Sequence, residues 1–202
     1  MIGLLGLGDI ARDQGDVVGV RTYTGQSLAI ARELGIQWAI GFALNNLALA
    51  EYFDGHLTRA RALVDESVSL FRSLKADGSL AEVLITTGQI VRAQGDARAA
   101  YAALSEALRL ALSFGPHLMV AYALENLADV VAARGQTQLA VQCLAAASAL
   151  REQMGTPVRP VDQSAVEQTL ATARSTLGDD AFAAVWAEAQ ALPLEQILNT
   201  LT

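Results

Sequence analysis

The chain has 202 residues, of which 52% are hydrophobic and only 5% aromatic, and its formal net charge is −7. Much of the apolar share is alanine, which favours helices, and the scarcity of aromatic residues argues against a large β-sheet. Because nucleic-acid binders usually carry a basic surface, the acidic charge balance argues against direct nucleic-acid binding by this chain.

Targeting and redox features favour a cytoplasmic protein. No apolar span has the length of a transmembrane helix, and no signal peptide opens the chain, so we expect no membrane contact. Cys143 is the single cysteine, which excludes an intramolecular disulfide and fits a reducing compartment.

A glycine recurs at a fixed interval of 40 residues along most of the chain, at Gly15, Gly55, Gly95 and Gly135. Eight residues before these glycines stand Leu7, Leu47, Thr87 and Leu127, and five residues after them stand Val20, Ala60, Ala100 and Ala140. Asp16 and Asp96 directly follow two of the glycines, where a carboxylate can cap the next helix. A spacing that holds at several positions indicates tandem copies of one structural unit.

Each unit is predicted to be two helices joined by a tight turn. In the second unit Leu44 and Leu47 share one helical face before Gly55, and Ala60 and Val64 share another after it. The glycine follows the first helix, where a left-handed conformation ends a helix most easily without a Cβ atom. We therefore predict helix pairs over residues of about 1–35, 36–75, 76–115 and 116–155.

The register stops after the fourth pair, and residues 156–202 are predicted to form a helical C-terminal cap. Pro157 and Pro160 make a stiff turn that cannot continue a helix. The capping-box spacing that starts at Ser164 predicts a helix that ends near Gly178.

A further helix is expected to follow, capped by Asp179 or Asp180. It carries Phe182 and Trp186 on one side, and these bulky side chains are expected to cover the open end of the repeats. Pro193 is expected in the first turn of a last short helix.

The repeated unit resembles the tetratricopeptide repeat. That family has a leucine eight residues before the turn glycine and small residues seven before, five after and twelve after it, and these places around Gly55 hold Leu47, Ala48, Ala60 and Ser67. The period of 40 residues, against about 34 in that family, is similar to the longer repeats of kinesin light chain and of bacterial multidomain regulators. The resemblance implies an all-α fold, a right-handed α-solenoid of four tetratricopeptide-like helix pairs with C-terminal capping helices.

The C-terminal third resembles the end of the sensor region in large bacterial signal-transduction ATPases, including LuxR-type regulators. The similarity lies in residues 145–154, 175–182, 186–188 and 192–195. It implies a sensor or scaffold domain of a larger transcriptional or signalling regulator, which binds a protein or peptide and needs no cofactor. The GxxxxGK[ST] phosphate-binding motif of that family's nucleotide-binding module does not occur in this chain.

In the tetratricopeptide family the first helix of each pair lines a concave groove that binds partners. The groove-facing places lie thirteen, ten, nine and six residues before the turn glycine. They carry over to Phe42, Asn45, Asn46, Leu49, Glu82, Gln89, Tyr122, Glu125, Asn126 and Asp129, with Ile85 and Thr86 at two further places of the third repeat. The acidic members favour a basic or amide-rich ligand over an acidic one.

Alternatives stay open for four of these side chains. Asn46 and Asn126 lie two periods apart, and their amides either bind the backbone of an extended peptide or bridge neighbouring helices. Phe42 and Tyr122 either contact the ligand or serve as packing residues.

The sequence offers little chemistry for catalysis or metal binding. His56 and His117 are the only histidines, and with Cys143 they give no zinc-ligand spacing. We therefore expect a binding protein and not an enzyme. A stand-alone scaffold that associates with itself is the second reading, and an enzyme such as a regulatory phosphatase on a repeat scaffold is the third.

The first helix is predicted to begin late, because the register of the later repeats extrapolates to a start before Met1. Its apolar face at Ile2, Leu4 and Leu5 then has no preceding helix to cover it. Because uncapped solenoid ends tend to associate, we expect that the chain is a fragment or a truncated product, and that in isolation it forms a homodimer through residues 1–30 or frays there.

Overall fold

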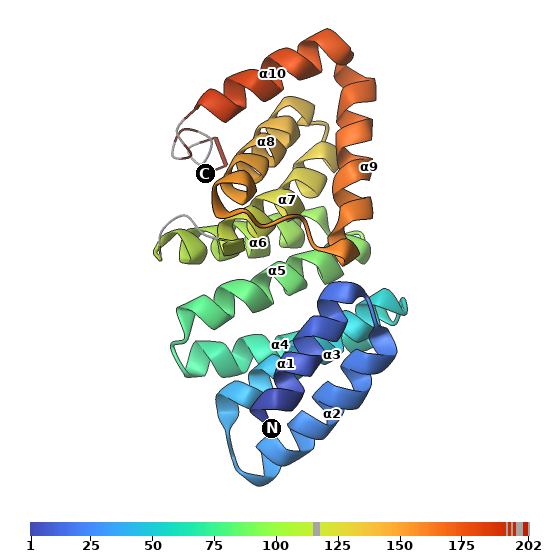
Figure 1. Ribbon diagram of the computed structural model, residues 1–202, viewed down its shortest axis with the longest axis vertical. Helices are drawn as coiled ribbons and strands as arrows, with labels where there is room; N and C mark the ends of the chain where they lie inside the picture. Colours follow the sequence, from blue (N-terminus) through green and yellow to red (C-terminus); the bar gives the residue numbers. More distant parts are fainter. Residues whose placement is uncertain (115–117, 193, 195, 197–199, 202) are drawn as a thin grey trace.

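The computed structural model describes residues 1–114, 118–192, 194, 196, 200 and 201. Its helices in this part of the chain are α1 (Ile2–Gln14), α2 (Val17–Glu33), α3 (Gln37–Phe53), α4 (Leu57–Ser73), α5 (Asp77–Ala93), α6 (Ala97–Leu112), α7 (Leu118–Ala133), α8 (Thr137–Met154), α9 (Pro160–Leu177) and α10 (Asp179–Ala191). Each of the first eight packs against its neighbours in sequence, so the chain is a solenoid of helix pairs (Figure 1). The predicted all-α fold is confirmed.

Tight turns with a left-handed residue join the two helices of each pair. The backbone φ angle is 75° at Gly15, 78° at Gly55, 90° at Gly95 and 77° at Gly135. A Cβ atom is unfavourable in this region, which explains why glycine recurs there. Lys75 adopts φ 52° at the end of the second pair, where Gly35 and Gly155 stand in the first and fourth pairs. The predicted boundary between the third and fourth pairs, at residues 115 and 116, lies outside the described residues.

The two predicted aspartate caps are confirmed. The Asp16 carboxylate accepts a hydrogen bond from the backbone N–H of Gly19 at 2.9 Å, at the start of α2. The Asp96 carboxylate accepts one from the N–H of Ala99 at 2.8 Å, at the start of α6. Each bond satisfies one of the amides that a helix leaves free in its first turn.

Small residues at the recurring positions bring the two helices of a pair close together. Gly88 of α5 lies against α6 so tightly that an added Cβ atom would stand 2.5 Å from Cγ of Leu104. Gly25 of α2 is different, because an added Cβ there would meet nothing within 4 Å. The close packing of pairs therefore depends on particular glycines and not on glycine content in general.

We expect Gly88→Ala and Gly25→Ala to change stability in opposite directions. Alanine gains roughly 1 kcal/mol over glycine in a helix interior, which should stabilise the Gly25→Ala variant. Overpacking of about 1–3 kcal/mol outweighs this gain at Gly88, so that variant should be less stable than the parent. Urea unfolding followed by circular dichroism measures both, and a more stable Gly88→Ala variant would contradict the tight packing.

Helix α9 begins at Pro160, so the predicted start at Ser164 is wrong. Proline suits the first position of a helix, because its ring presets φ and the missing N–H has no partner there in any case. Ser164 instead lies exposed within the helix. The helix ends before Gly178, as predicted.

The predicted capping role of Asp179 or Asp180 is wrong. Gly178 is the residue before α10, and neither aspartate caps the helix through its side chain. Gly178 has φ 81° and turns the chain itself, so the aspartates fall in the first turn of α10. A carboxylate there still interacts favourably with the positive end of the helix dipole.

Helix α10 covers α8 with the aromatic side chains expected from the sequence. Phe182 is buried against Val141 and Ala173, and Trp186 is partly buried beside it with the two rings stacked at 5.8 Å. The predicted last helix after Pro193 falls mostly outside the described residues, and Pro193 itself is outside them.

The chain returns from the far end of the stack towards its first helix. After α8, residues 155–159 cross α7 and α6 in the view of Figure 1, and α9 stands upright beside the stack. Helix α9 contacts α1, α7 and α8. The C-terminal cap is therefore also a lateral support that joins the first pair to the fourth.

The uncovered apolar face of α1 differs from the one expected. Ile2 is 67% exposed, but Leu4 is only partly exposed and Leu5 is buried at 6% exposed. Leu7 and Ile10 are exposed instead, at 45% and 57%. The expectation failed because Leu5 lies on the side of α1 that packs against the buried residues of α2 and α3.

Candidate functional site

The first helices of the pairs, α1, α3, α5 and α7, contact one another and form one face of the stack. Two chambers of about 260 and 270 Å³ lie on this face, and α9 or the residue before it borders each of them. The first of these, which we call the Glu82 chamber, is lined by the predicted groove residues Phe42, Leu49, Glu82, Gln89 and Tyr122, with Ile85 and Thr86. The Asn126 chamber is lined by Gln89, Glu125, Asn126 and Asp129.

Arg12 of α1 organises the polar wall of the Glu82 chamber. Its Nη1 lies 3.0 Å from Oε1 of Glu82 and 3.4 Å from Oδ1 of Asp9, and it donates to Oδ1 of Asn46 at 2.9 Å. Its Nε lies 3.1 Å from Oδ1 of Asp13. Partners from α1, α3 and α5 thus hold one guanidinium group whose side chain is 11% exposed.

Arg159 extends this charged series to the C-terminal helix. Its Nη1 lies 3.3 Å from Oδ1 of Asp13, and its Nε lies 2.6 Å from Oδ2 of Asp162 in α9. Acidic and basic groups therefore alternate from Glu82 through Arg12, Asp13 and Arg159 to Asp162. The series ties α5 and α1 to the start of α9 across the inner face.

Two guanidinium groups lie over the ring of Tyr122. The Arg159 group stands 4.2 Å from the ring centroid and the Arg151 group 4.8 Å from it. Arg151 also donates from Nη1 to the carbonyl oxygen of Pro157 at 2.8 Å. These contacts fix the segment that precedes α9 against Tyr122.

Burial shifts the pKa values of the side chains that line the Glu82 chamber. Removal from water raises the pKa of the Glu82 carboxyl, and the nearby charge of Arg12 acts in the opposite direction. Burial also disfavours the charge on Arg12, but Glu82, Asp13 and Asp9 outweigh it and raise the arginine pKa. Arg12 therefore stays positively charged, and it remains paired with the carboxylates of Glu82, Asp13 and Asp9 in the chamber wall. Burial also raises the pKa of the Tyr122 hydroxyl, while the charges of Arg159 and Arg151 act in the opposite direction.

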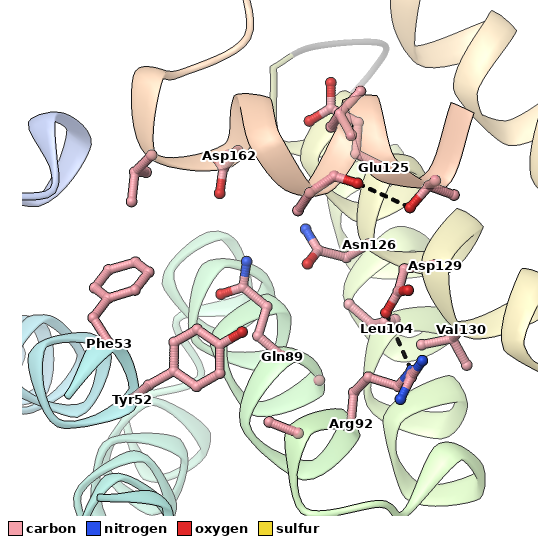
Figure 2. Close-up of a pocket in the computed structure, with 16 residues that line it drawn as sticks. Tyr52, Phe53, Gln89, Arg92, Leu104, Glu125, Asn126, Asp129, Val130 and Asp162 are labelled. Atoms are coloured by element: carbon pink, nitrogen blue, oxygen red, sulfur yellow. Dashed lines mark hydrogen bonds and ion pairs between the residues drawn. The ribbon is translucent and has the colours of Figure 1, made fainter. Parts of the chain in front are cut away.

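The Asn126 chamber presents several groups that can hydrogen-bond a peptide. The amides of Gln89 in α5 and Asn126 in α7 point toward one another across it (Figure 2). Tyr52 of α3 turns its hydroxyl towards Gln89, and Asp162 reaches in from α9. Amide, hydroxyl and carboxylate groups together offer both donors and acceptors to a polypeptide.

An ion pair forms one wall of the same chamber. Nε of Arg92 in α5 lies 3.1 Å from Oδ2 of Asp129 in α7 (Figure 2). Both side chains are partly exposed, at 34% and 49%. Asp129 therefore presents a carboxylate that a ligand can reach.

Asn45 and Asn46, although predicted for the groove, are 0% exposed and line neither chamber. Asn46 donates from Nδ2 to Oδ1 of Asp9 at 2.7 Å and accepts from Arg12, so it bridges α3 to α1. Asn126 donates to the carbonyl oxygen of Tyr122 in its own helix at 2.8 Å while its side chain borders the chamber. The two asparagines, two periods apart, thus differ in their surroundings.

Glu125 lies at the edge of the Asn126 chamber and is 7% exposed. Both its carboxylate oxygens accept hydrogen bonds from Arg151 of α8, at 2.5 and 2.8 Å. Burial raises the pKa of Glu125, and the hydrogen bonds from Arg151 oppose that shift. The carboxylate is thus committed to α8 rather than presented to the chamber.

The sequence prediction missed several residues of the chambers. Arg12, Tyr52 and Arg92 all stand three residues before a turn glycine. This shared position in the repeat would have been enough to predict the three residues together. Asp9 stands six residues before Gly15, which is a groove place that the prediction did not extend to the first repeat. Arg159 and the α9 residues lie outside the repeat and have no such signal.

Groups with other chemistry are few in the part of the chain that the structure describes. No group of three or more His, Cys, Asp or Glu side chains there has the arrangement of a metal site. Cys143 is buried, which raises the pKa of its thiol to about 12 and leaves it unreactive. None of the described helices is long and apolar enough to cross a membrane.

Comparison with known proteins does not assign this chain to a family. No protein-family model matches it, and no curated protein matches it significantly. The chain is thus an all-helical protein whose helices pack in sequential pairs, as in a helical repeat, with two chambers on the face of the first helices.

Proposed function

We propose that this chain is a protein- or peptide-binding domain of the tetratricopeptide type, a sensor or scaffold within a larger cytoplasmic bacterial regulator and not an enzyme. One observation carries the proposal. The predicted groove residues, apart from Asn45 and Asn46, gather around two chambers on the face formed by the first helices. Side chains drawn from several repeats onto one face are what a groove that binds an extended segment requires.

The ligand we propose is a polypeptide segment that carries arginine or lysine. Glu82, Asp9 and Asp13 line one chamber together with Arg12 and Arg159, and Asp129 and Asp162 border the other together with Arg92, so carboxylates outnumber guanidinium groups in each. Complementary charge favours a basic ligand over an acidic one.

The protein's own chain supports this choice of ligand. Arg159 already lies over Tyr122 and beside Asp13 at the chamber edge. A partner segment would make contacts of the same kind, with its side chains in the chambers beside α9.

The test is a selection of random peptides displayed on phage against the full chain, followed by affinity measurements with labelled synthetic peptides. We expect the selected peptides to be rich in arginine and lysine. Asp129→Asn should weaken their binding about tenfold or more, because a hydrogen bond to a charged group contributes about 1.5–3 kcal/mol. Fluorescence anisotropy measures the change.

The matched control is Asp65→Asn on the outside of α4. Asp65 pairs with Arg61 at 2.8 Å much as Asp129 pairs with Arg92 at 3.1 Å, but it borders neither chamber. It should leave peptide binding unchanged. Selected peptides without a basic bias, or equal effects of the two substitutions, would refute the groove as the binding site.

A stand-alone scaffold that associates with itself is the second candidate. The exposure of Ile2, Leu7 and Ile10 at the end of the stack favours it. Sedimentation velocity over a range of concentrations decides between a monomer and a homodimer formed through residues 1–30.

A further inference from the structure

The outer face of α1 carries apolar side chains that nothing in the described chain covers. Leu7 is 45% exposed and Ile10 is 57% exposed. Gly3 and Gln14 are also exposed and stand on the same side of the helix, because residues three or four apart share one face. A Cβ atom added at Gly3 would meet nothing within 4 Å, so a neighbour has room to approach.

In the later repeats, the equivalent face of the first helix is covered by another helix. The counterparts of Gly3, Leu7 and Ile10 follow at intervals of 40 residues. They are Ala43, Leu47 and Ala50 in α3, Val83, Thr87 and Ile90 in α5, and Ala123, Leu127 and Val130 in α7. Leu47 is partly buried and all the others are buried. Only the copy in α1 is open.

The cover in each later repeat is the second helix of the preceding pair. Helix α2 packs on α3, α4 on α5, and α6 on α7. At the first of these contacts Val20 of α2 shares a buried cluster with Ala50 of α3. Ala60 and Ala100 occupy the same register as Val20 in α4 and α6, and both are fully buried.

A polar residue ends this face in each later repeat and contacts the covering helix. The contacts are Asp54 with Arg21 at 2.6 Å, Gln94 with the carbonyl oxygen of Leu57 at 3.3 Å, and the guanidinium of Arg134 over the ring of Tyr101 at 4.7 Å. Gln14 occupies this place in the first pair. The contacts join the end of one helix to the start of the other, so the covering helix runs antiparallel.

We propose that the outer face of α1, made of Gly3, Leu7, Ile10 and Gln14, binds an amphipathic helix of a partner protein. That helix lies antiparallel to α1, places a small apolar residue against Ile10, and brings its first turn to Gln14. It extends to α1 the interface that the chain itself builds three times. The proposal concerns a different surface from the groove and does not depend on the groove ligand.

A second copy of the chain is less well suited to this face. In the described part of the chain α2, α4 and α6 are already committed to α3, α5 and α7, and α8 is covered by α9 and α10. Among the described helices a second copy therefore offers none that is free and of the covering kind. Its own α1 carries the uncovered face and not the covering one.

The test uses a labelled peptide of residues 95–113, which holds α6 and its Asp96 cap. In this peptide glutamate replaces Arg98 and lysine replaces Ala102, both exposed in α6, and an amide bond between the two new side chains keeps the peptide helical. We expect it to bind the full chain one to one, as measured by fluorescence anisotropy. Ile10→Glu should weaken binding by about tenfold or more, because it places a charge at the centre of the apolar contact. Hydrogen exchange should slow in α1 when the peptide binds.

Val18→Glu is the matched control. Val18 is 74% exposed, but its counterparts Thr58, Arg98 and Gln138 are exposed too, so this position stays in water in every repeat. The control should bind the peptide as the parent does, and so should the groove variant Asp129→Asn.

Three results would overturn the proposal. The first is a peptide of scrambled sequence that binds as well as the α6 peptide, and the second is an Ile10→Glu variant that keeps full affinity. The third is a homodimer of the parent chain that Ile10→Glu dissociates, since that result assigns the face to a second copy. Absence of binding by the bridged peptide counts against the proposal equally, because circular dichroism establishes beforehand that both the peptide and the variants are helical.

Discussion

Arg151→Ala is expected to lower the free energy of unfolding by about 3–5 kcal/mol, because it leaves the carboxylate of Glu125 buried without its partner. Glu125 and Arg151 are 7% and 5% exposed, and two hydrogen bonds of 2.5 and 2.8 Å join them. The substitution also removes the donor to the carbonyl oxygen of Pro157, which helps to hold the segment before α9. Urea unfolding at neutral pH measures the loss.

The repeat itself suggests how to repair that variant. One period earlier, the places of Glu125 and Arg151 are held by Ile85 and Ala111, both buried. The double variant Glu125→Ile, Arg151→Ala transplants this apolar pair into the fourth repeat. Apolar replacement of a buried ion pair is often neutral, so the double variant should regain most of the lost stability.

An exposed arginine provides the control for this pair. Arg72→Ala removes the partner of Glu106 on the outside of the stack, where the Arg72 side chain is 55% exposed. It should change stability by less than about 0.5 kcal/mol. A double variant as unstable as Arg151→Ala alone would show that Pro157 and the ring of Tyr122, rather than the buried carboxylate, account for the loss.

Phe71→Ala is expected to destabilise the protein by about 3–5 kcal/mol, because the ring is 0% exposed and alanine would leave a cavity. The ring packs edge-on to Phe42 with centroids 5.0 Å apart. On another side it lies over Gly41, where an added Cβ atom would stand 2.7 Å from its Cζ. Phe53→Ala is the control, because Phe53 is 40% exposed and should lose only about 1 kcal/mol.

The glycine under this ring allows a sharper test. Gly41→Ala should destabilise the parent, because its Cβ atom overlaps the ring of Phe71. In the Phe71→Ala variant the same substitution should be stabilising, because the methyl group enters the cavity and alanine favours the helix. Thermal and urea unfolding of all four proteins gives the coupling. Additive effects of the two substitutions would mean that they do not share this space.

The groove was predictable to the extent that it follows the repeat. A helical period and a fixed spacing place Phe42, Glu82 and Tyr122 at one register, and the structure brings all three to one chamber. The same rule placed Asn45 and Asn46 there, and both are buried. The position of a residue within the repeat fixes only approximately the side of the helix on which it lies. The angle at which neighbouring helices cross then decides whether its side chain borders a chamber or contacts the next helix.

By itself, the sequence determined the helix pairs, their turns and two of their caps. The φ angle of 78° at Gly55 and the bond from Gly19 to Asp16 depend on residues within a few positions of one another, so they leave a local mark in the sequence. Only the tertiary structure decided how the chain closes on itself. Arg12 meets Glu82 at a separation of 70 residues, and Arg159 meets Asp13 at a separation of 146. Such contacts arise from the path of the whole solenoid, and neither helical period nor repeat spacing encodes them.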